Sequence, residues 1–202
     1  MIFVPDFLQT GDVILFKGSS WLSYIIEFFG RSPFSHVGMI VRNPRRIGID
    51  LDDGVYLLES GWNVLPDAEN HRQKYGVQLH LLTDVIDACP SGSVFVRAIE
   101  CARNDKFYHQ LRELHAKIHD RPYDIRLMDW LEAEYNLEVP FAPSARFRTT
   151  DRFWCASLVA YLFDQLGLIE PVNWSLVAPR EFTTAGSLKF TCMIDQEREL
   201  RK

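Results

Sequence analysis

The sequence predicts an α+β fold in which helices pack against an antiparallel sheet. In the first half of the chain, short apolar runs alternate with turn residues, which is typical of strands joined by tight loops. Later segments repeat their apolar residues at helical spacing and begin at capping residues. With 202 residues, 47% of them apolar, the chain can bury one core. We therefore expect one domain over residues 1–194 and a charged tail over 195–202 that frays.

Three strands are expected early in the chain, over Asp12–Phe16, His36–Val41 and Val55–Glu59. A helix is expected between the first two strands, over Trp21–Phe29, because two serines can cap it and a glycine follows it. The loops between these elements are short. Antiparallel pairing of the strands is therefore the simplest topology.

The middle of the chain is expected to complete the sheet. The segment from Gly61 to Tyr75 is mostly polar and predicts a long loop over the sheet. Two further strands are expected over Val77–Leu81 and Val94–Ile99, separated by a short segment over Thr83–Cys89 and a turn. A last strand is expected near the end, over Leu188–Met193.

Two helices are expected in the second half of the chain. Asp105 can cap the first, whose apolar residues recur at i, i+4, i+7 and i+11. Thr150 or Asp151 can cap the second, which ends at Gly167. The segment 136–150 before it contains two prolines and no periodicity, so it is expected to form a loop.

The composition disfavours several classes of protein. The formal net charge is −5 and the estimated pI is 5.7, so no nucleic-acid partner is expected. The N-terminal segment lacks the basic and apolar regions of a signal peptide, which indicates a cytoplasmic protein. The apolar stretch Trp21–Phe29 is shorter than the roughly 20 residues that cross a bilayer. It could pack as a core helix or make peripheral contact with a membrane surface.

The cysteines and histidines suggest neither a disulfide scaffold nor a metal site. The chain has four cysteines without a CxxC pair, which fits a reducing compartment. His115 and His119 lie four positions apart on a helix and could form a metal pair. No acidic or thiol ligand is indicated beside them, so they are expected on solvated helix faces. No metal and no cofactor are expected.

Cys155 is the candidate nucleophile of the chain. It lies at the start of the amphipathic run RFWCASLVAYLF, in the first turn of the expected helix. The free backbone N–H groups and the macrodipole at a helix start favour an anion, and therefore a thiolate. The alternative is a buried and inert cysteine, which is common among free cysteines.

His36 and Glu59 are candidate partners of this thiol. His36 begins one expected strand, and an imidazole is a suitable base for a thiol. Glu59 ends the next strand, in the otherwise apolar run VYLLE. If these strands pair antiparallel, Glu59 lies beside His36 and can orient its ring. A core histidine and a solvated strand-end carboxylate are the structural alternatives.

Several segments together resemble a known superfamily. They are TGDVILFKG, FSHVGMIV, VYLLESG, RPYD, FWCASLVAYLFDQLG and VAPREF. In order and rough spacing they resemble the circularly permuted branch of the NlpC/P60 papain-like superfamily, the YiiX/YebB-like group. This group has relatives among lecithin:retinol acyltransferase-like proteins and a poxvirus family. The resemblance implies a permuted papain-like fold, in which the cysteine follows the histidine in sequence.

The resemblance also implies roles for single residues. Cys155 matches the nucleophile, His36 the base and Glu59 the third polar group of the family. Tyr123 and Asp124 match its YD element, a wall of the site.

Two tryptophans are further candidates for contact with substrate. Trp154 precedes the candidate nucleophile, and Trp21 opens the expected aromatic helix.

These features predict a cysteine hydrolase or acyltransferase that acts on an amide or ester bond through a thioester acyl-enzyme. The substrate would be a small molecule, a lipid-linked molecule or a peptide. One alternative is a cysteine peptidase or isopeptidase, and another is a binding module of the same fold without turnover. A weaker alternative is a metal-dependent hydrolase with His36, Glu59 and Cys155 as ligands. The sequence does not define the oligomeric state.

Overall fold

The structure is a computed structural model that describes residues 5–18, 32–62, 65–123 and 153–200. Its strands are β1 (Val13–Phe16), β2 (His36–Arg42), β3 (Val55–Trp62), β4 (Tyr75–Leu81), β5 (Val94–Arg97), β6 (Ile99–Glu100), β7 (Met193–Ile194) and β8 (Arg198–Glu199). Its α-helices are α2 (Leu82–Ala88), α3 (Asp105–Ile118) and α5 (Cys155–Gln165). Short 3₁₀ helices are η1 (Pro44–Ile47), η3 (Trp174–Leu176) and η4 (Pro179–Phe182).

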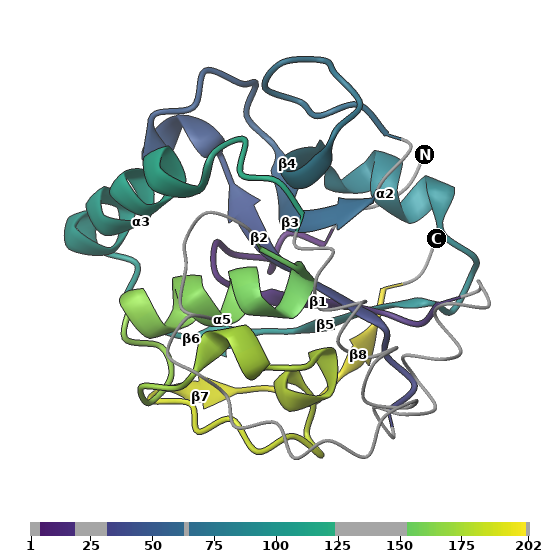
Figure 1. The fold of residues 1–202 in the computed structure, drawn as a ribbon, viewed down its shortest axis with the longest axis vertical. Coiled ribbons are helices and arrows are strands. Elements are labelled where there is room, and N and C mark those ends of the chain that lie inside the picture. Colours follow the sequence, from purple (N-terminus) through teal and green to yellow (C-terminus); the bar gives the residue numbers. More distant parts are fainter. Residues whose placement is uncertain (1–4, 19–31, 63–64, 124–152, 201–202) are drawn as a thin grey trace, which may run out of the picture.

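One antiparallel sheet carries the fold. Its strand order is β4-β3-β2-β1-β5-β8, and each neighbouring pair is antiparallel (Figure 1). β6 and β7 form a second, two-stranded sheet. The α+β fold with an antiparallel sheet is therefore confirmed, and the first three strands pair in the order that their short connections predicted.

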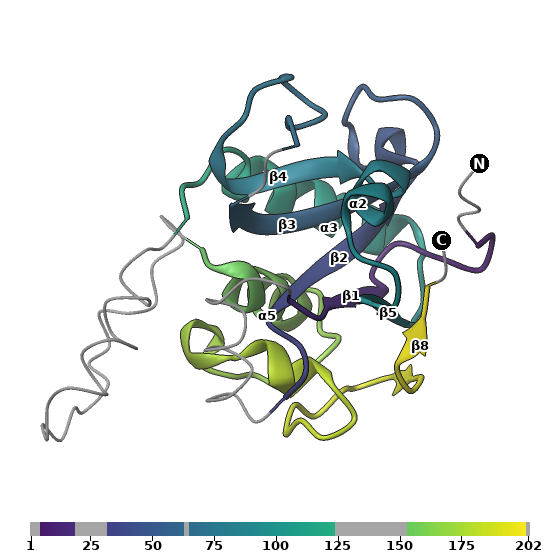
Figure 2. The ribbon, with the colours of Figure 1, turned by 90° about the vertical axis from the view of Figure 1, so that its right-hand side faces the viewer.

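Helices cover both faces of the sheet. Alternate residues of a strand point to opposite faces, and β1 shows this directly. Val13 and Leu15 belong to an apolar cluster with α3 and α5, whereas Ile14 and Phe16 belong to another with α2. Figure 1 accordingly shows α3 and α2 on opposite sides of β3 and β4, and Figure 2 shows α2 in front of the strands.

The middle of the chain differs from its prediction at several places. The expected loop over Gly61–Tyr75 is shorter, because Gly61 and Gly76 still pair with each other in the β3–β4 ladder. Most of the segment Thr83–Cys89 lies in α2. The buried face of this helix consists of Leu82, Val85 and Ile86. A seven-residue amphipathic helix is too short for its periodicity to stand out in the sequence.

The C-terminal predictions were partly wrong. Of the expected strand Leu188–Met193, only Met193 lies in a strand, because Phe190 instead forms an isolated bridge with Ile169. The tail does not fray through residue 200. β8 pairs with β5, and Leu200 is 5% exposed and donates its N–H to the Val94 carbonyl at 2.8 Å. The pairing of β8 with β5, which is distant in sequence, and the burial of Leu200 hold this charged segment in place.

Other predictions lie outside the described residues. The expected helix Trp21–Phe29 and the expected loop 136–150 are among them. Within the described ranges, no helix has both the length and the apolar character needed to cross a bilayer.

Gly76 allows two distant segments to meet at the edge of the sheet. Its φ is +142°, and a Cβ there would lie 2.1 Å from the Arg121 carbonyl oxygen. The chain after α3 can therefore cross β4 closely. There the Tyr123 N–H donates to the Tyr75 carbonyl at 3.2 Å, and the Phe153 N–H donates to the Pro122 carbonyl at 3.1 Å. This contact fixes the backbone directly before α5.

The start of α5 is capped differently from its prediction. The helix begins at Cys155 after Trp154, so neither Thr150 nor Asp151 is its cap. The Trp154 N–H donates to the Ser157 hydroxyl at 3.0 Å, and that hydroxyl is 2.9 Å from the Trp154 carbonyl. Ser157 satisfies backbone groups that a helix start leaves unpaired. As a result, Cys155 is the first residue of the helix.

Gly76→Ala should destabilise the protein much more than Gly167→Ala. Both glycines have positive φ, but a Cβ at Gly167 meets nothing within 4 Å. We expect a loss in the free energy of unfolding of about 1 kcal/mol for Gly167→Ala, from backbone strain alone. For Gly76→Ala we expect roughly 3 kcal/mol or more, because the clash adds to the strain. Urea unfolding of both variants measures the difference, and equal losses would contradict the role given to Gly76.

Candidate active site

Cys155 lies where backbone electrostatics favour a negative sulfur. It is the first residue of α5 and is 4% exposed. The first N–H groups of a helix have no partner within the helix, and the helix dipole is positive at this end. The prediction that Cys155 lies in the first turn of a helix is therefore confirmed.

His36 brings an imidazole to this sulfur. It is the first residue of β2, and the ring of Phe16, its partner in β1, has its centroid 5.5 Å away. Its side chain lies near enough to Cys155 for charge and hydrogen-bond interactions with that residue to raise the pKa of His36. The side chain keeps 27% of its surface exposed, so the pair is reachable from solvent. The fold thus joins two residues that are far apart in sequence.

Glu59 holds the ring of His36 from the other side. It lies on β3, which pairs antiparallel with β2 as expected, and it is 3% exposed. Glu59 Oε2 accepts a hydrogen bond from His36 Nε2. Because Nε2 is bound to Glu59, Nδ1 is the ring nitrogen left for the sulfur of Cys155. The three predicted residues therefore form one connected chain of side chains.

The charges in this chain stabilise one another. Burial alone would lower the pKa of His36, but the charges of Cys155 and Glu59 and hydrogen bonds to both raise it well above its ordinary value of 6.5. Burial alone would raise the pKa of Glu59, but the charge of His36, the hydrogen bond from His36 and the neighbouring His80 imidazole hold it far below 4.5. Both shifts favour the state in which His36 is protonated and Glu59 is ionised.

The backbone of β3 supports this arrangement in two further ways. The Ser60 hydroxyl donates to the Phe153 carbonyl at 2.6 Å, which ties β3 to the residues before α5. A Cβ at Gly61 would lie 3.4 Å from Glu59 Oε2 and 3.4 Å from His36 Cε1. A glycine therefore leaves room for the ion pair, while the neighbouring serine positions the helix that carries the sulfur.

Two of the four predicted substrate-binding residues, Tyr123 and Trp154, lie in the described part of the chain. Tyr123 is half-buried and forms a bridge with Phe153, two residues before Cys155. Trp154 is half-buried next to Cys155, and its Nε1 atom is buried without a hydrogen-bond partner. Asp124 and Trp21 lie outside the described residues. Contact with substrate remains a prediction for all four.

Two buried polar residues of β4 were not predicted to belong to this site. His80 Nε2 lies 3.3 Å from Glu59 Oε1, and Gln78 is paired with Glu59 across the β3–β4 ladder. They are 2% and 1% exposed, respectively. The signal was present in the run VQLHL, where two polar residues alternate with Val77 and Leu79. A strand with one face in solvent shows the same alternation of apolar and polar residues. The sequence pattern alone therefore did not show that His80 and Gln78 are buried.

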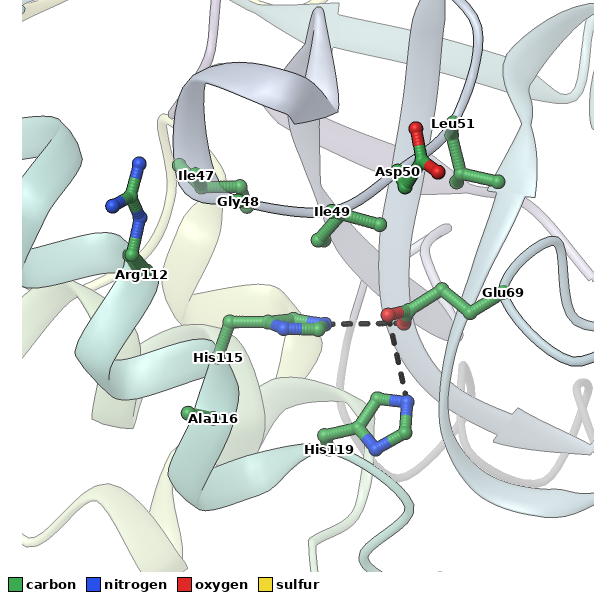
Figure 3. Close-up of a pocket in the computed structure, with 10 residues that line it drawn as sticks. All are labelled: Ile47, Gly48, Ile49, Asp50, Leu51, Glu69, Arg112, His115, Ala116 and His119. Carbon is green, nitrogen blue, oxygen red and sulfur yellow. Dashed lines mark hydrogen bonds and ion pairs between the residues drawn. The ribbon is translucent and has the colours of Figure 1, made fainter.

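A second histidine–glutamate cluster lies in a pocket of about 570 Å³ beside α3 (Figure 3). Glu69 Oε2 is 3.1 Å from His115 Nε2, and Glu69 Oε1 is 3.5 Å from His119 Nε2. The expectation of two solvated histidines was wrong for His115, which is 7% exposed. Its acidic partner comes from the loop before β4, far away in the sequence.

The side chains near Cys155 do not fit a metal ion in this arrangement. The His36 and His80 nitrogens each face a different oxygen of Glu59 and do not converge on a shared point. Across the described ranges, no group of three or more His, Cys, Asp or Glu side chains could hold a metal. The proposed ligand set of His36, Glu59 and Cys155 is not supported by this geometry.

Comparison with solved structures finds a similar architecture in the crystal structure of the metalloprotein YiiX from Escherichia coli O157:H7. The TM-score is 0.51, with 20% sequence identity, over 78% of this chain and 66% of the YiiX chain. The chain has a YiiX-like fold. The fold expected from the sequence resemblance is thus confirmed, while the low identity carries no activity or ligand over from YiiX. No protein-family model and no curated protein matches the sequence.

Cys155 should react faster than Cys101 and Cys192 at acidic pH. Burial raises the pKa of Cys101 and of Cys192, whereas Cys155 adjoins the His36 imidazolium. At pH 6 we expect iodoacetamide to modify Cys155 roughly tenfold faster or more than either of the other two. Peptide mass spectrometry over a time course measures the three rates.

His36→Ala should remove this advantage of Cys155 at pH 6, because the imidazolium that stabilises the thiolate is gone. The exposed histidine variant His109→Ala serves as the control and should keep it. Equal rates for the three thiols in the unmodified sequence would contradict the assigned pairing.

Proposed function

We propose that the chain is a cysteine hydrolase or acyltransferase that cleaves an amide or ester bond through a thioester acyl-enzyme. The observation that carries the proposal is the contact of the Cys155 sulfur, at a helix start, with a His36 imidazole that Glu59 orients. A nucleophile, a base and an orienting group in hydrogen-bond reach are the requirement for nucleophilic catalysis by a thiol.

The reaction follows from the protonation states that the site favours. The Cys155 thiolate attacks the carbonyl carbon, so that a carbon–sulfur bond forms and the carbonyl oxygen becomes an oxyanion. The backbone N–H of Cys155, which has no acceptor within the helix, is suited to bind this oxyanion. The His36 imidazolium then gives its proton to the leaving amine or alcohol as the bond to the carbonyl carbon breaks. A thioester on Cys155 and a neutral imidazole remain.

The second half of the reaction regenerates the thiolate. The neutral His36 imidazole takes a proton from an incoming water, alcohol or amine, which attacks the thioester carbonyl. The carbon–sulfur bond breaks, the acyl group leaves as acid, ester or amide, and the thiolate–imidazolium pair is restored. Hydrolysis and transfer therefore differ only in the acceptor, and a peptide bond would be cleaved by the same steps.

The structurally similar protein YiiX is named as a metalloprotein, which raises the question whether a metal ion binds near Cys155. Among the described residues, the geometry offers no ligand set around Cys155, and the His36 and His80 imidazoles both lie against Glu59. The proposed steps therefore involve only Cys155, His36 and Glu59.

An acyl group should accumulate on Cys155 when the protein is given activated esters. Incubation with p-nitrophenyl acetate and p-nitrophenyl laurate should release p-nitrophenol and add one acyl mass to the Cys155 peptide. Cys155→Ala should reduce the release by about a thousandfold or more, since the nucleophile is lost. Cys192→Ala should behave as the unmodified sequence. Hydroxylamine as a second acceptor would separate transfer from hydrolysis, and equal release by Cys155→Ala would refute the proposal.

Glu59→Gln should shift the pH dependence of ester cleavage in a defined direction. Catalysis needs the imidazolium, so activity falls at alkaline pH as His36 loses its proton. The charge of Glu59 raises the pKa of His36, so its removal should move the alkaline limb of kcat/KM to lower pH. Rates from pH 5 to 10 measure the limb. A limb that stays in place, or moves upward, would contradict the assigned role of Glu59.

A further inference from the structure

We propose that His80 is a positioning residue, whose imidazole holds the Glu59 carboxylate in the orientation that His36 requires. The inference rests on the proposed function and extends it by one residue. Glu59 places one oxygen on each of two histidines, with Oε2 on His36 and Oε1 3.3 Å from His80 Nε2. The four side chains Cys155, His36, Glu59 and His80 thus form a continuous series across α5, β2, β3 and β4.

Both ring nitrogens of His80 face hydrogen-bond acceptors. Its Nδ1 is 3.1 Å from the Pro66 carbonyl oxygen, which can only accept a hydrogen bond. Its Nε2 lies 3.3 Å from Glu59 Oε1, and an ionised carboxylate also only accepts. His80 therefore lies between an acceptor on the loop and an acceptor on β3.

Glu59 needs an external partner to fix its carboxylate plane. The last torsion of a glutamate side chain has broad minima, so rotamer preference alone does not set this plane. The residue is 3% exposed, and water cannot readily satisfy an oxygen that His36 leaves over. The His80 imidazole, itself 2% exposed, supplies a partner for that oxygen.

His80 is in turn held by a clamped loop. The Asp67 side chain accepts from the Leu79 N–H at 2.8 Å, and the Ala68 N–H donates to the Leu79 carbonyl at 2.7 Å. Lys74 Nζ pairs with Asp67 Oδ2 at 2.7 Å. These contacts fix the Pro66 carbonyl beside β4. Glu59 is thus the charged group that pairs with His80, and the Asp67–Lys74 pair lies on the loop that contacts it.

Two substitutions separate the contact with Glu59 from the contact with the loop. In His80→Gln, the amide nitrogen takes approximately the place of Nε2 and can still donate to Glu59. In His80→Asn, the shorter amide takes approximately the place of Nδ1 and can donate only to Pro66. Ester cleavage and the rate of Cys155 alkylation are measured for both variants from pH 5 to 10, with urea unfolding as a check on stability.

The proposal expects the two variants to differ in one direction. His80→Asn should lower kcat/KM roughly tenfold or more, as for other outer partners of an oriented histidine. His80→Gln should keep kcat/KM within about threefold, because its amide nitrogen can still donate to Glu59. Equal values of kcat/KM for the two variants, or a better His80→Asn, would overturn the proposal and leave His80 as an anchor of the loop.

His115 offers a matched control for these substitutions. It is also a buried histidine paired with a glutamate, Glu69, at 3.1 Å, but it lies on α3 in a separate pocket. His115→Asn should lower stability in a similar way and leave kcat/KM and the pH limbs unchanged. If the proposed function were wrong, the unmodified protein would not become acylated at Cys155 in the experiment with p-nitrophenyl esters. Normal acylation with no difference between the His80 variants would overturn only the role of His80.

Discussion

A carboxylate buried between two imidazoles is the constraint on which the rest of this site depends. An unpaired Glu59 at this depth would cost several kcal/mol, so the fold must supply cationic or donating partners on both of its oxygens. His36 and His80 do so from the strands on either side of β3. A slip of one residue in either ladder would turn Glu59 toward the apolar cluster that holds Leu58. The orientation of His36 by Glu59 therefore depends on the correct register of the β2–β3 and β3–β4 pairs.

The sulfur reaches this carboxylate–imidazole pair through a second set of contacts. Gly76 lets the chain after α3 approach the backbone of β4, and the Phe153 backbone joins that segment and also accepts from Ser60. Both contacts involve main-chain groups whose positions are fixed by the sheet. The first turn of α5 therefore has little freedom relative to β3, and Cys155 keeps its place beside His36. Rigid support of this kind is what a near-attack geometry demands.

Local patterns in the sequence were sufficient for the strands β1 to β4, for α3 and for the trio Cys155, His36 and Glu59. Alternation, capping residues and an isolated polar residue in an apolar run are all properties of short segments. The failures involve partners supplied by distant segments. The charged tail is ordered because β8 adds to β5, and His115 is buried because Glu69 reaches it from another loop. His80 was visible as a polar residue in a strand, but only the β3–β4 register shows that it faces Glu59.

The described part of the chain contains two clusters in which a glutamate lies between two histidines, and their difference shows what defines the candidate active site. Glu69 joins His115, in the last turn of α3, to His119, the residue directly after this helix, and the His119 side chain is 36% exposed. Glu59 joins His36 and His80 from separate strands, and the His80 side chain is 1% exposed. Only the latter cluster adjoins the sulfur of Cys155, and only there does the paired imidazole have an anion to protonate or to stabilise. A histidine–glutamate pair alone is therefore a structural device of this fold, and the thiol at the start of α5 is what makes one of the two the candidate active site.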